Sequence, residues 1–586
     1  MFLVSTADET TWDTSKHICF LGEWCRRYSR RDIWQNLNSN VLPYHWDDRT
    51  KYNSDYYYLD GVYEDCLGQL WDELNRINCV SNNIDYWRIV VGPWLRFFID
   101  ALFDRFEIIS AAGNSGVVSD TWILPFSLSD WAPNGFSDFY ASLNDDRWNH
   151  VIFAECIRAL GLPHSEKPNG VVVKPEVRAS NLGSKKKIMQ SLLEAYQKLI
   201  PMHLNRHVVI SPYISYGGAM RLQVGIGQLP YLLAPSLALP DNTVDTDRRA
   251  TISINVGGKR FESLLEKLIP FLLPKVYIEN YDHFLKNALA TYPKRPSTIF
   301  TANAYQADDG FKFWAAEKRK NGTPLVIGQH GGNMGIAHHN QTEDHQVKIA
   351  DSFCSWGWMR PGIESIFPVP SLQLSQQGTL SHRENGDILL VLASLPRYFY
   401  CHFSMPLAGQ FLNYLNDQVL LISRVKPSAR SLISIRLNGD EYGWDIEARL
   451  GDAGLVAMID KSIDRLVSRL SKCRLCIVSY NATVILQTLE ANYPTIAYWD
   501  PDLFDIRPEA MPLVNRLREV GILHDTVESA AQLIDEIYND VQRWWQRPEL
   551  QDARIDFCNS YAKTSDTWIK DWAEHLDSVT LKECRQ

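Results

Sequence analysis

Alternation of apolar runs with amphipathic stretches is the feature that most limits the fold of this 586-residue chain. Residues 297–301 predict a strand, 309–320 an amphipathic helix and 325–328 a second strand. Four further apolar runs, each separated from the next by a predicted helix, follow at 388–393, 432–436, 476–479 and 494–499. Parallel strands require such crossover helices. We therefore predict an α/β protein with two Rossmann-like domains.

The remaining pattern predicts helical additions in the N-terminal part and a boundary near residue 371. Aromatic and aliphatic residues at three- and four-residue spacing indicate packed helices over 55–110. We divide the chain into residues 1–370, a polar linker at 371–386, a second domain at 387–565, and a tail at 566–586 whose helix packs back on the first domain. Further strands are predicted at 1–6, 208–212, 222–226 and 351–357 (the last of the first half), and further helices at 185–199, 261–273, 406–415, 456–470 and 482–489.

Composition excludes several classes of protein. A net charge of −10 argues against nucleic-acid binding, which needs a basic surface. Eleven cysteines without a disulfide-like spacing indicate reduced thiols in a cytoplasm. We see no secretion signal and no apolar run of about 18 residues, so we expect a cytoplasmic protein.

A glycine-rich stretch with a central histidine follows the predicted strand at 325–328. It contains Gln329, His330, Gly331, Gly332 and Asn333. Glycines let a substrate approach the backbone, and the imidazole could act as a base or hold a phosphate. The alternative is a tight turn with an incidental histidine.

A second polar group lies between a predicted buried strand and a helix. Ser479, Asn481 and Thr483 fall within five residues there. A helix start offers free N–H groups and the positive end of the dipole, which suit a nucleotide phosphate. An ordinary helix cap is the alternative.

These motifs together resemble a known family. The chain is similar to bacterial transferases found with O-antigen and other surface-polysaccharide genes, and a shorter part is similar to Kdo transferases; the segments that carry the resemblance are Thr6–Trp12, Phe20–Cys25, Gln329–Gly332, Trp356–Trp358 and Ser479–Thr483. The resemblance implies the GT-B fold of glycosyltransferases, in which two Rossmann-like domains face a central cleft. It also implies an acceptor-side first domain, a nucleotide-sugar-binding second domain and no metal cofactor.

The reaction implied by the resemblance is transfer of a sugar to a bacterial surface polysaccharide or its lipid-linked precursor, at the cytoplasmic face of the inner membrane. A CMP-activated 2-keto sugar such as Kdo is one candidate donor. A nucleotide-sugar epimerase of the same fold and a non-catalytic glycan-assembly scaffold are alternatives. Contact with the membrane would be peripheral, and we expect no nucleic-acid partner.

Candidate residues follow from these positions. We assign catalysis to His330 and Glu23, because Glu23 is a carboxylate at the end of an apolar run. Arginine matches phosphate geometry. By the resemblance, Gln487 stands where many GT-B glycosyltransferases carry a glutamate that binds the ribose of the donor. The predicted donor-binding set is therefore Ser479, Asn481, Thr483, Gln487, Arg397 and Arg436, and the sugar- or acceptor-binding set is Gln329, Gly331, Gly332, Asn333 and Asn303. His338, His339 and His345 have a spacing that fits no defined metal site.

Overall fold

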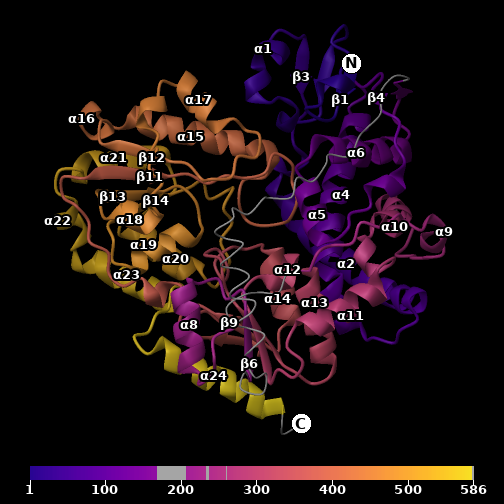
Figure 1. Ribbon diagram of the computed structural model, residues 1–586. Helices are drawn as coiled ribbons and strands as arrows, with labels where there is room; N and C mark the ends of the chain where they lie inside the picture. The colour runs from indigo at the N-terminus through magenta and orange to yellow at the C-terminus, as the bar shows by residue number, and fades with distance from the viewer. Residues whose placement is uncertain (168–205, 232–236, 259, 584–586) are drawn as a thin grey trace.

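The computed structural model describes residues 1–167, 206–231, 237–258 and 260–583 (Figure 1). Two five-stranded sheets, each parallel throughout, form the centres of two α/β units. The predicted fold class, two Rossmann-like units with helical additions in the N-terminal part, is confirmed. The helix predicted at 185–199 lies outside the described residues.

The first sheet carries the glycine-rich stretch at the end of its central strand. Its order is β10 (Ile366–Pro368), β9 (Ser352–Ser355), β8 (Leu325–Gly328), β7 (Thr298–Thr301) and β6 (His207–Ile210). Strands β7, β8 and β9 are fully buried, as expected for a parallel sheet covered on both faces. The prediction that β9 ends this half is wrong, since the short strand β10 follows it.

In the second sheet, successive strands are added first on one side of β11 and then on its other side. The order is β12 (Ile433–Arg436), β11 (Asp387–Val391), β13 (Cys473–Val478), β14 (Thr495–Tyr498) and β15 (Leu523–His524). The chain leaves β11 toward one edge and then returns to its other side with β13. Such a switch point is where open α/β sheets bind ligands, beyond the carboxyl ends of the strands.

The N-terminal part adds a small sheet and a helical layer. Strands β1 (Phe2–Val4), β2 (Ile18–Phe20) and β3 (Ser39–Val41) form a separate parallel sheet, and β4 (Trp122–Ile123) pairs with β5 (Ser165–Glu166). The helices predicted over 55–110 are confirmed. The helices of this part are α1 (Arg31–Trp34), α2 (Arg49–Asn78), α3 (Ile84–Val90), α4 (Gly92–Asn114), α5 (Phe136–Ser142) and α6 (Asp146–Leu160).

Most of the other helices surround the two large sheets. Beside the first sheet lie α8 (Tyr216–Gly225), α11 (Tyr281–Thr291), α12 (Ala304–Ala307), α13 (Asp309–Lys320) and α14 (Gln341–Ile349), whereas α10 (Arg260–Leu272) packs on α4, α6 and the short helix α9 (Thr246–Arg249). With the second belong α15 (Phe411–Arg424), α16 (Pro427–Arg430), α17 (Ile446–Asp452), α18 (Leu466–Leu470), α19 (Thr483–Glu490), α20 (Met511–Glu519), α21 (Val527–Ile537), α22 (Val541–Trp545) and α23 (Pro548–Tyr561).

Two further element predictions are wrong. Residues 222–225 belong to helix α8 and Ile226 is its C-cap, because Ser215 caps the helix and Gly218, Ala219 and Leu222 form one buried face at helical spacing. The single helix predicted over 456–470 is divided into a 3-10 turn and α18. Asp460, between the two pieces, pairs with Arg436 and Arg469, which holds the chain there in an irregular path.

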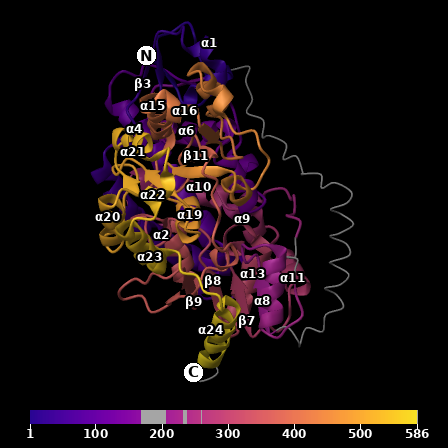
Figure 2. The ribbon, with the colours of Figure 1, turned by 90° about the vertical axis from the view of Figure 1, so that its left-hand side faces the viewer.

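The tail contacts the first sheet. Helix α24 (Trp568–Glu583) packs on β7 and α8 (Figure 2), where Trp572 Nε1 donates to the carbonyl of Pro370 at 2.8 Å. The segment 371–386 carries a 3-10 turn and the buried Leu372 and Leu374, so part of it is packed. In the part of the chain that the structure describes, no helix is both long and apolar enough to cross a membrane.

Candidate functional site

The glycine-rich loop after β8 is fixed at its base by Gln329. The Oε1 atom of Gln329 accepts from Trp356 N and from Trp358 Nε1, both at 2.8 Å, and its Nε2 donates to the carbonyl of Gly331 at 2.8 Å. Gln329 is 5% exposed. The predicted sugar contact at Gln329 would therefore compete with three internal hydrogen bonds. Its observed task is to hold the loop against the Trp356–Trp358 turn.

Gly332 brings this loop onto the second α/β unit. Its N–H donates to Thr483 Oγ1 at 3.1 Å. A Cβ added at Gly332 would lie 2.3 Å from Thr483 N and 2.4 Å from the carbonyl carbon of Ala482. Only glycine permits so close an approach of two backbones. The loop after β8 and the start of α19 are therefore in direct contact, and their use as one ligand site stays a prediction.

Helix α19 begins without a side-chain cap. Its N-cap residue is Ala482, which has no side chain able to accept from the first-turn N–H groups. Ser479 Oγ instead donates to Val391 O at 3.1 Å and bonds Tyr414 Oη at 2.6 Å, while Nδ2 of Asn481 is buried without a partner. Ser479, Asn481 and Thr483 are therefore not explained as an ordinary helix cap. No side chain caps the first-turn N–H groups of α19, so these groups can donate to a ligand.

His330 is half-buried beside two aromatic rings. Tyr213 lies edge-on at 5.5 Å between centroids, and Tyr305 lies at 6.4 Å. Burial lowers the pKa of His330 to about 4, so its imidazole is neutral at pH 7. Its Nδ1 is buried without a hydrogen-bond partner. A neutral ring with a free polar atom is suited to donate to, or accept from, a bound ligand.

The far end of the loop, at Gly335, is held by the buried carboxylate of Glu343. Glu343, fully buried on α14, accepts from Gly335 N at 2.8 Å and pairs with Arg360 and, at 3.1 Å, with Arg507. Asn333 Oδ1 accepts from Asn340 Nδ2 at 3.2 Å. The loop is therefore anchored at Gly331, Gly332, Asn333 and Gly335, which preorganises the backbone around His330.

Comparison with protein families gives the class of the protein. A family model described as LIC12162 family transferase matches residues 1–576. The chain belongs to the LIC12162 family of transferases. The match includes the loop after β8, the start of α19 and the small N-terminal sheet, so the transferase is an enzyme whose family extends over both α/β units.

Solved structures and curated proteins were also compared. The transferase is similar to Anabaena Alr3699/HepE in complex with UDP and glucose, with 14% identity over 64% of this chain and 100% of that one (TM-score 0.35). It is also similar to the S. aureus MnaA–UDP co-structure, with 11% identity over 63% of this chain and 95% of that one (TM-score 0.34). A third similar structure is WaaG, a glycosyltransferase involved in lipopolysaccharide biosynthesis, with 12% identity over 63% of this chain and 99% of that one (TM-score 0.29). No curated protein matched.

Glu23 lies in a different part of the transferase from His330. It follows β2 of the small N-terminal sheet, and its carboxylate holds Arg26 with Nε at 3.1 Å. Its Cβ lies near Gly409, where a Cβ added to that glycine would be 3.1 Å away. The structure thus places Glu23 against the segment before α15, and its catalytic role stays a prediction.

The guanidinium groups of Arg397 and Arg436 bind other residues of the protein. Arg397, 3% exposed, donates to Tyr442 O at 3.1 Å, to Trp24 O at 2.5 Å and to Asp146 at 3.0 Å. Arg436 donates to Asp460 at 3.0 Å and to Asp464 O at 2.6 Å. Their guanidinium groups join segments of the transferase, so we do not carry them into the proposed donor site.

The other predicted residues lie closer to the loop or to α19. Asn303 precedes α12 at the end of β7, and its side chain makes no cap bond there. Gln487 lies on α19, and its carbonyl accepts from Gln377 Nε2 at 2.9 Å. Both remain predictions.

Several residues of the site were missed from the sequence. Tyr213, with a left-handed φ of 58°, and Tyr414 owe their places to loops and packing that no local motif reveals. Glu343 also lacks a local signal, since it lies within the polar stretch between His339 and His345. Among the described residues, no group of three or more His, Cys, Asp or Glu side chains could hold a metal ion.

Proposed function

We propose that the transferase moves a sugar from a nucleotide donor to a bacterial surface-polysaccharide acceptor. Membership of a transferase family and two parallel α/β units that meet at their strand ends support this reaction. The observation that carries the proposal is the contact of Gly332 with Thr483. It joins a glycine loop to an uncapped helix start, an arrangement suited to a phosphate-bearing substrate.

In this proposal the donor phosphate lies at the start of α19, beside the switch point between β11 and β13. The dipole of α19 and its free N–H groups stabilise the charge that develops on the leaving nucleotide. A CMP-activated 2-keto sugar such as Kdo, a lipopolysaccharide-type acceptor and a position at the cytoplasmic face of the inner membrane rest on the sequence resemblance.

His330 contributes to this site as a neutral imidazole. A pKa of about 4 makes it a weak base in the free enzyme, since catalytic bases work best with a pKa near the working pH. The ring also bonds to the backbone of Ala302, so the unpartnered Nδ1 of the neutral ring can accept from a ligand hydroxyl, and it donates to the leaving phosphate once it carries a proton. A bound phosphate would also raise the pKa of His330, because an adjacent negative charge favours the protonated ring.

Calorimetric titration with CMP-, UDP-, GDP- and dTDP-linked sugars tests the proposal. We expect one nucleotide class to bind and His330→Ala to lower the transfer rate. If none of the donors binds, the proposal is wrong. Conversion of a donor to its epimer without acceptor would indicate an epimerase, and polysaccharide assembly undisturbed by His330→Ala with Glu23→Ala would indicate a scaffold.

A further inference from the structure

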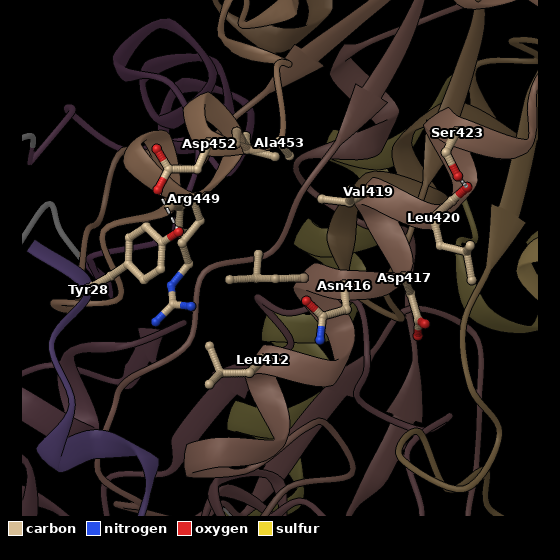
Figure 3. A pocket seen from close by; sticks show the side chains of 13 residues that line it. Tyr28, Leu412, Asn416, Asp417, Val419, Leu420, Ser423, Arg449, Asp452 and Ala453 are labelled. Carbon is tan, nitrogen blue, oxygen red and sulfur yellow. Dashed lines mark hydrogen bonds between the residues drawn. The ribbon is translucent and has the colours of Figure 1, made fainter. Parts of the chain in front are cut away.

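A pocket of about 650 Å³ lies between α15 and α17, away from the glycine loop (Figure 3). Tyr28, from the N-terminal part, forms one of its sides. None of the residues assigned to the proposed donor site lines it. Its volume falls in the range of ligand sites, which are about 300–1,000 Å³.

The walls of the pocket are mainly aliphatic. They come from one face of α15 and the facing side of α17, and consist of Leu412, Leu415, Val419, Leu420, Ile446 and Leu450. At about 30 Å³ per water-sized group, the pocket has room for roughly twenty such groups. An aliphatic chain of ten or more carbons fits that volume and would bury this surface.

Arg449 places a positive charge in these apolar surroundings. Its Nε donates to Trp444 O at 2.8 Å, and its guanidinium carbon lies 4.2 Å from the centre of the Tyr28 ring. No carboxylate in the described part of the chain forms an ion pair with Arg449 within 4.0 Å. Burial lowers the pKa of Arg449, and the nearby Tyr28, Glu23 and Asp445 offset this only in part.

Two aspartates of the pocket, Asp417 and Asp452, limit where an anionic group can bind. Asp452 is already bonded to Tyr28 Oη at 2.7 Å and to Arg31 at 3.2 Å. Burial, together with Asp500 and Glu528, raises the pKa of Asp417 to about 6. In Figure 3 Asp417 and Arg449 point into different parts of the pocket. An anionic group is therefore favoured at Arg449 and disfavoured near Asp417.

We propose that this pocket binds an amphipathic anion, an aliphatic chain whose phosphate or carboxylate head pairs with the guanidinium of Arg449. The planar fork of arginine matches both head groups, and the chain extends along the aliphatic face of α15. None of the residues of the proposed donor site lines this pocket, so the proposal does not depend on which donor the protein uses.

The test is calorimetric titration of the full chain with decyl phosphate below its micelle concentration, with no nucleotide present. The wild type is expected to bind, and Arg449→Gln to bind at least about tenfold more weakly. Val419→Trp, which fills the pocket and leaves Arg449 in place, should also weaken binding. Arg424→Gln is the matched control, because Arg424 is an exposed arginine of α15 that does not line the pocket. Thermal unfolding of each variant shows that it is folded.

Decanoate, decanol and inorganic phosphate complete the experiment. The stronger of decyl phosphate and decanoate identifies the head group, and binding of either supports the proposal. Decanol or inorganic phosphate binding as tightly as the amphipaths would overturn it, as would equal binding by folded Arg449→Gln. Since no sugar donor enters the assay, a negative result here leaves the proposed transferase activity unaffected, and failure of donor binding leaves this site unaffected.

Discussion

At the scale of single residues, adjacent glycines in one loop have different tasks. Gly332 is in contact with the backbone of α19, whereas a Cβ added at Gly331 would meet only Asn333 Oδ1 at 3.8 Å and Met334 Cε at 3.9 Å. The sequence shows two equivalent glycines. The structure shows that one of them is required by the neighbouring unit.

We predict that Gly332→Ala pushes the loop and α19 apart. Such overpacking costs about 1–3 kcal/mol, and the displaced helix start should lose affinity for the donor. Denaturant unfolding and donor titration measure the two effects. Gly331→Ala is the control and should change neither by much. Equal effects of the two substitutions would show that the close approach at Gly332 is unimportant.

At the scale of elements, the glycine loop depends on charged groups from two other segments. Glu343 on α14 holds Gly335, and it is itself held by Arg360 and Arg507. Removing one partner of a buried ion pair leaves the other charge uncompensated. The loop should therefore be sensitive to changes that never touch a substrate.

Glu343→Gln is predicted to lower the free energy of unfolding by about 3–5 kcal/mol, the cost of breaking a buried pair. The exposed pair of Arg547 with Glu549 offers the control, since Glu549→Gln should cost no more than about 1 kcal/mol. Urea unfolding compares them. Similar small losses for both would mean that Glu343 does not anchor the loop.

Sequence periodicity predicts the elements well where one pattern is strong. The bounds of α13 and β8 agree with the expected ranges, because amphipathic spacing and a continuous apolar run are local signals. Periodicity fails for α8, because three glycines and a short buried face leave no clear helical period in its sequence. The interruption at Asp460 depends on arginines 24 and 9 residues away along the chain, which no local window includes.

The candidate site was predictable in part for the same reason. The loop after β8 and the start of α19 are each contiguous motifs at strand ends, and parallel strands bring such ends to one edge. Arg397 was expected at the donor, but its partners Trp24 and Asp146 are more than 250 residues away. Such pairings are set by tertiary packing, so composition and spacing do not reveal them.

At the scale of the whole molecule, buried histidines make the stability depend on pH. Burial lowers the pKa of His150 and His330 to about 4 and that of His345 to about 3. In the unfolded chain histidine titrates near 6.5. Between these values the unfolded state binds more protons, so the free energy of unfolding should fall as the pH drops from about 6.5 to 4.

We predict that His150→Gln makes this fall shallower. His150 Nε2 accepts from Leu124 N at 3.1 Å, a bond that a glutamine oxygen can replace without taking up a proton. Each pKa unit corresponds to about 1.4 kcal/mol. Urea unfolding at several pH values between 7 and 4.5 measures the slope. An unchanged slope in the variant would show that His150 does not contribute to it.

The central claim is that the donor nucleotide binds at the start of α19, beside the place where the glycine loop contacts it. A crystal structure of the protein with the nucleotide that binds in titration tests it most directly. We predict that a phosphate oxygen accepts hydrogen bonds from first-turn N–H groups of α19, with the imidazole of His330 facing the same ligand. A nucleotide bound elsewhere, with the contact of Gly332 and Thr483 undisturbed and no ligand beside it, would contradict the claim.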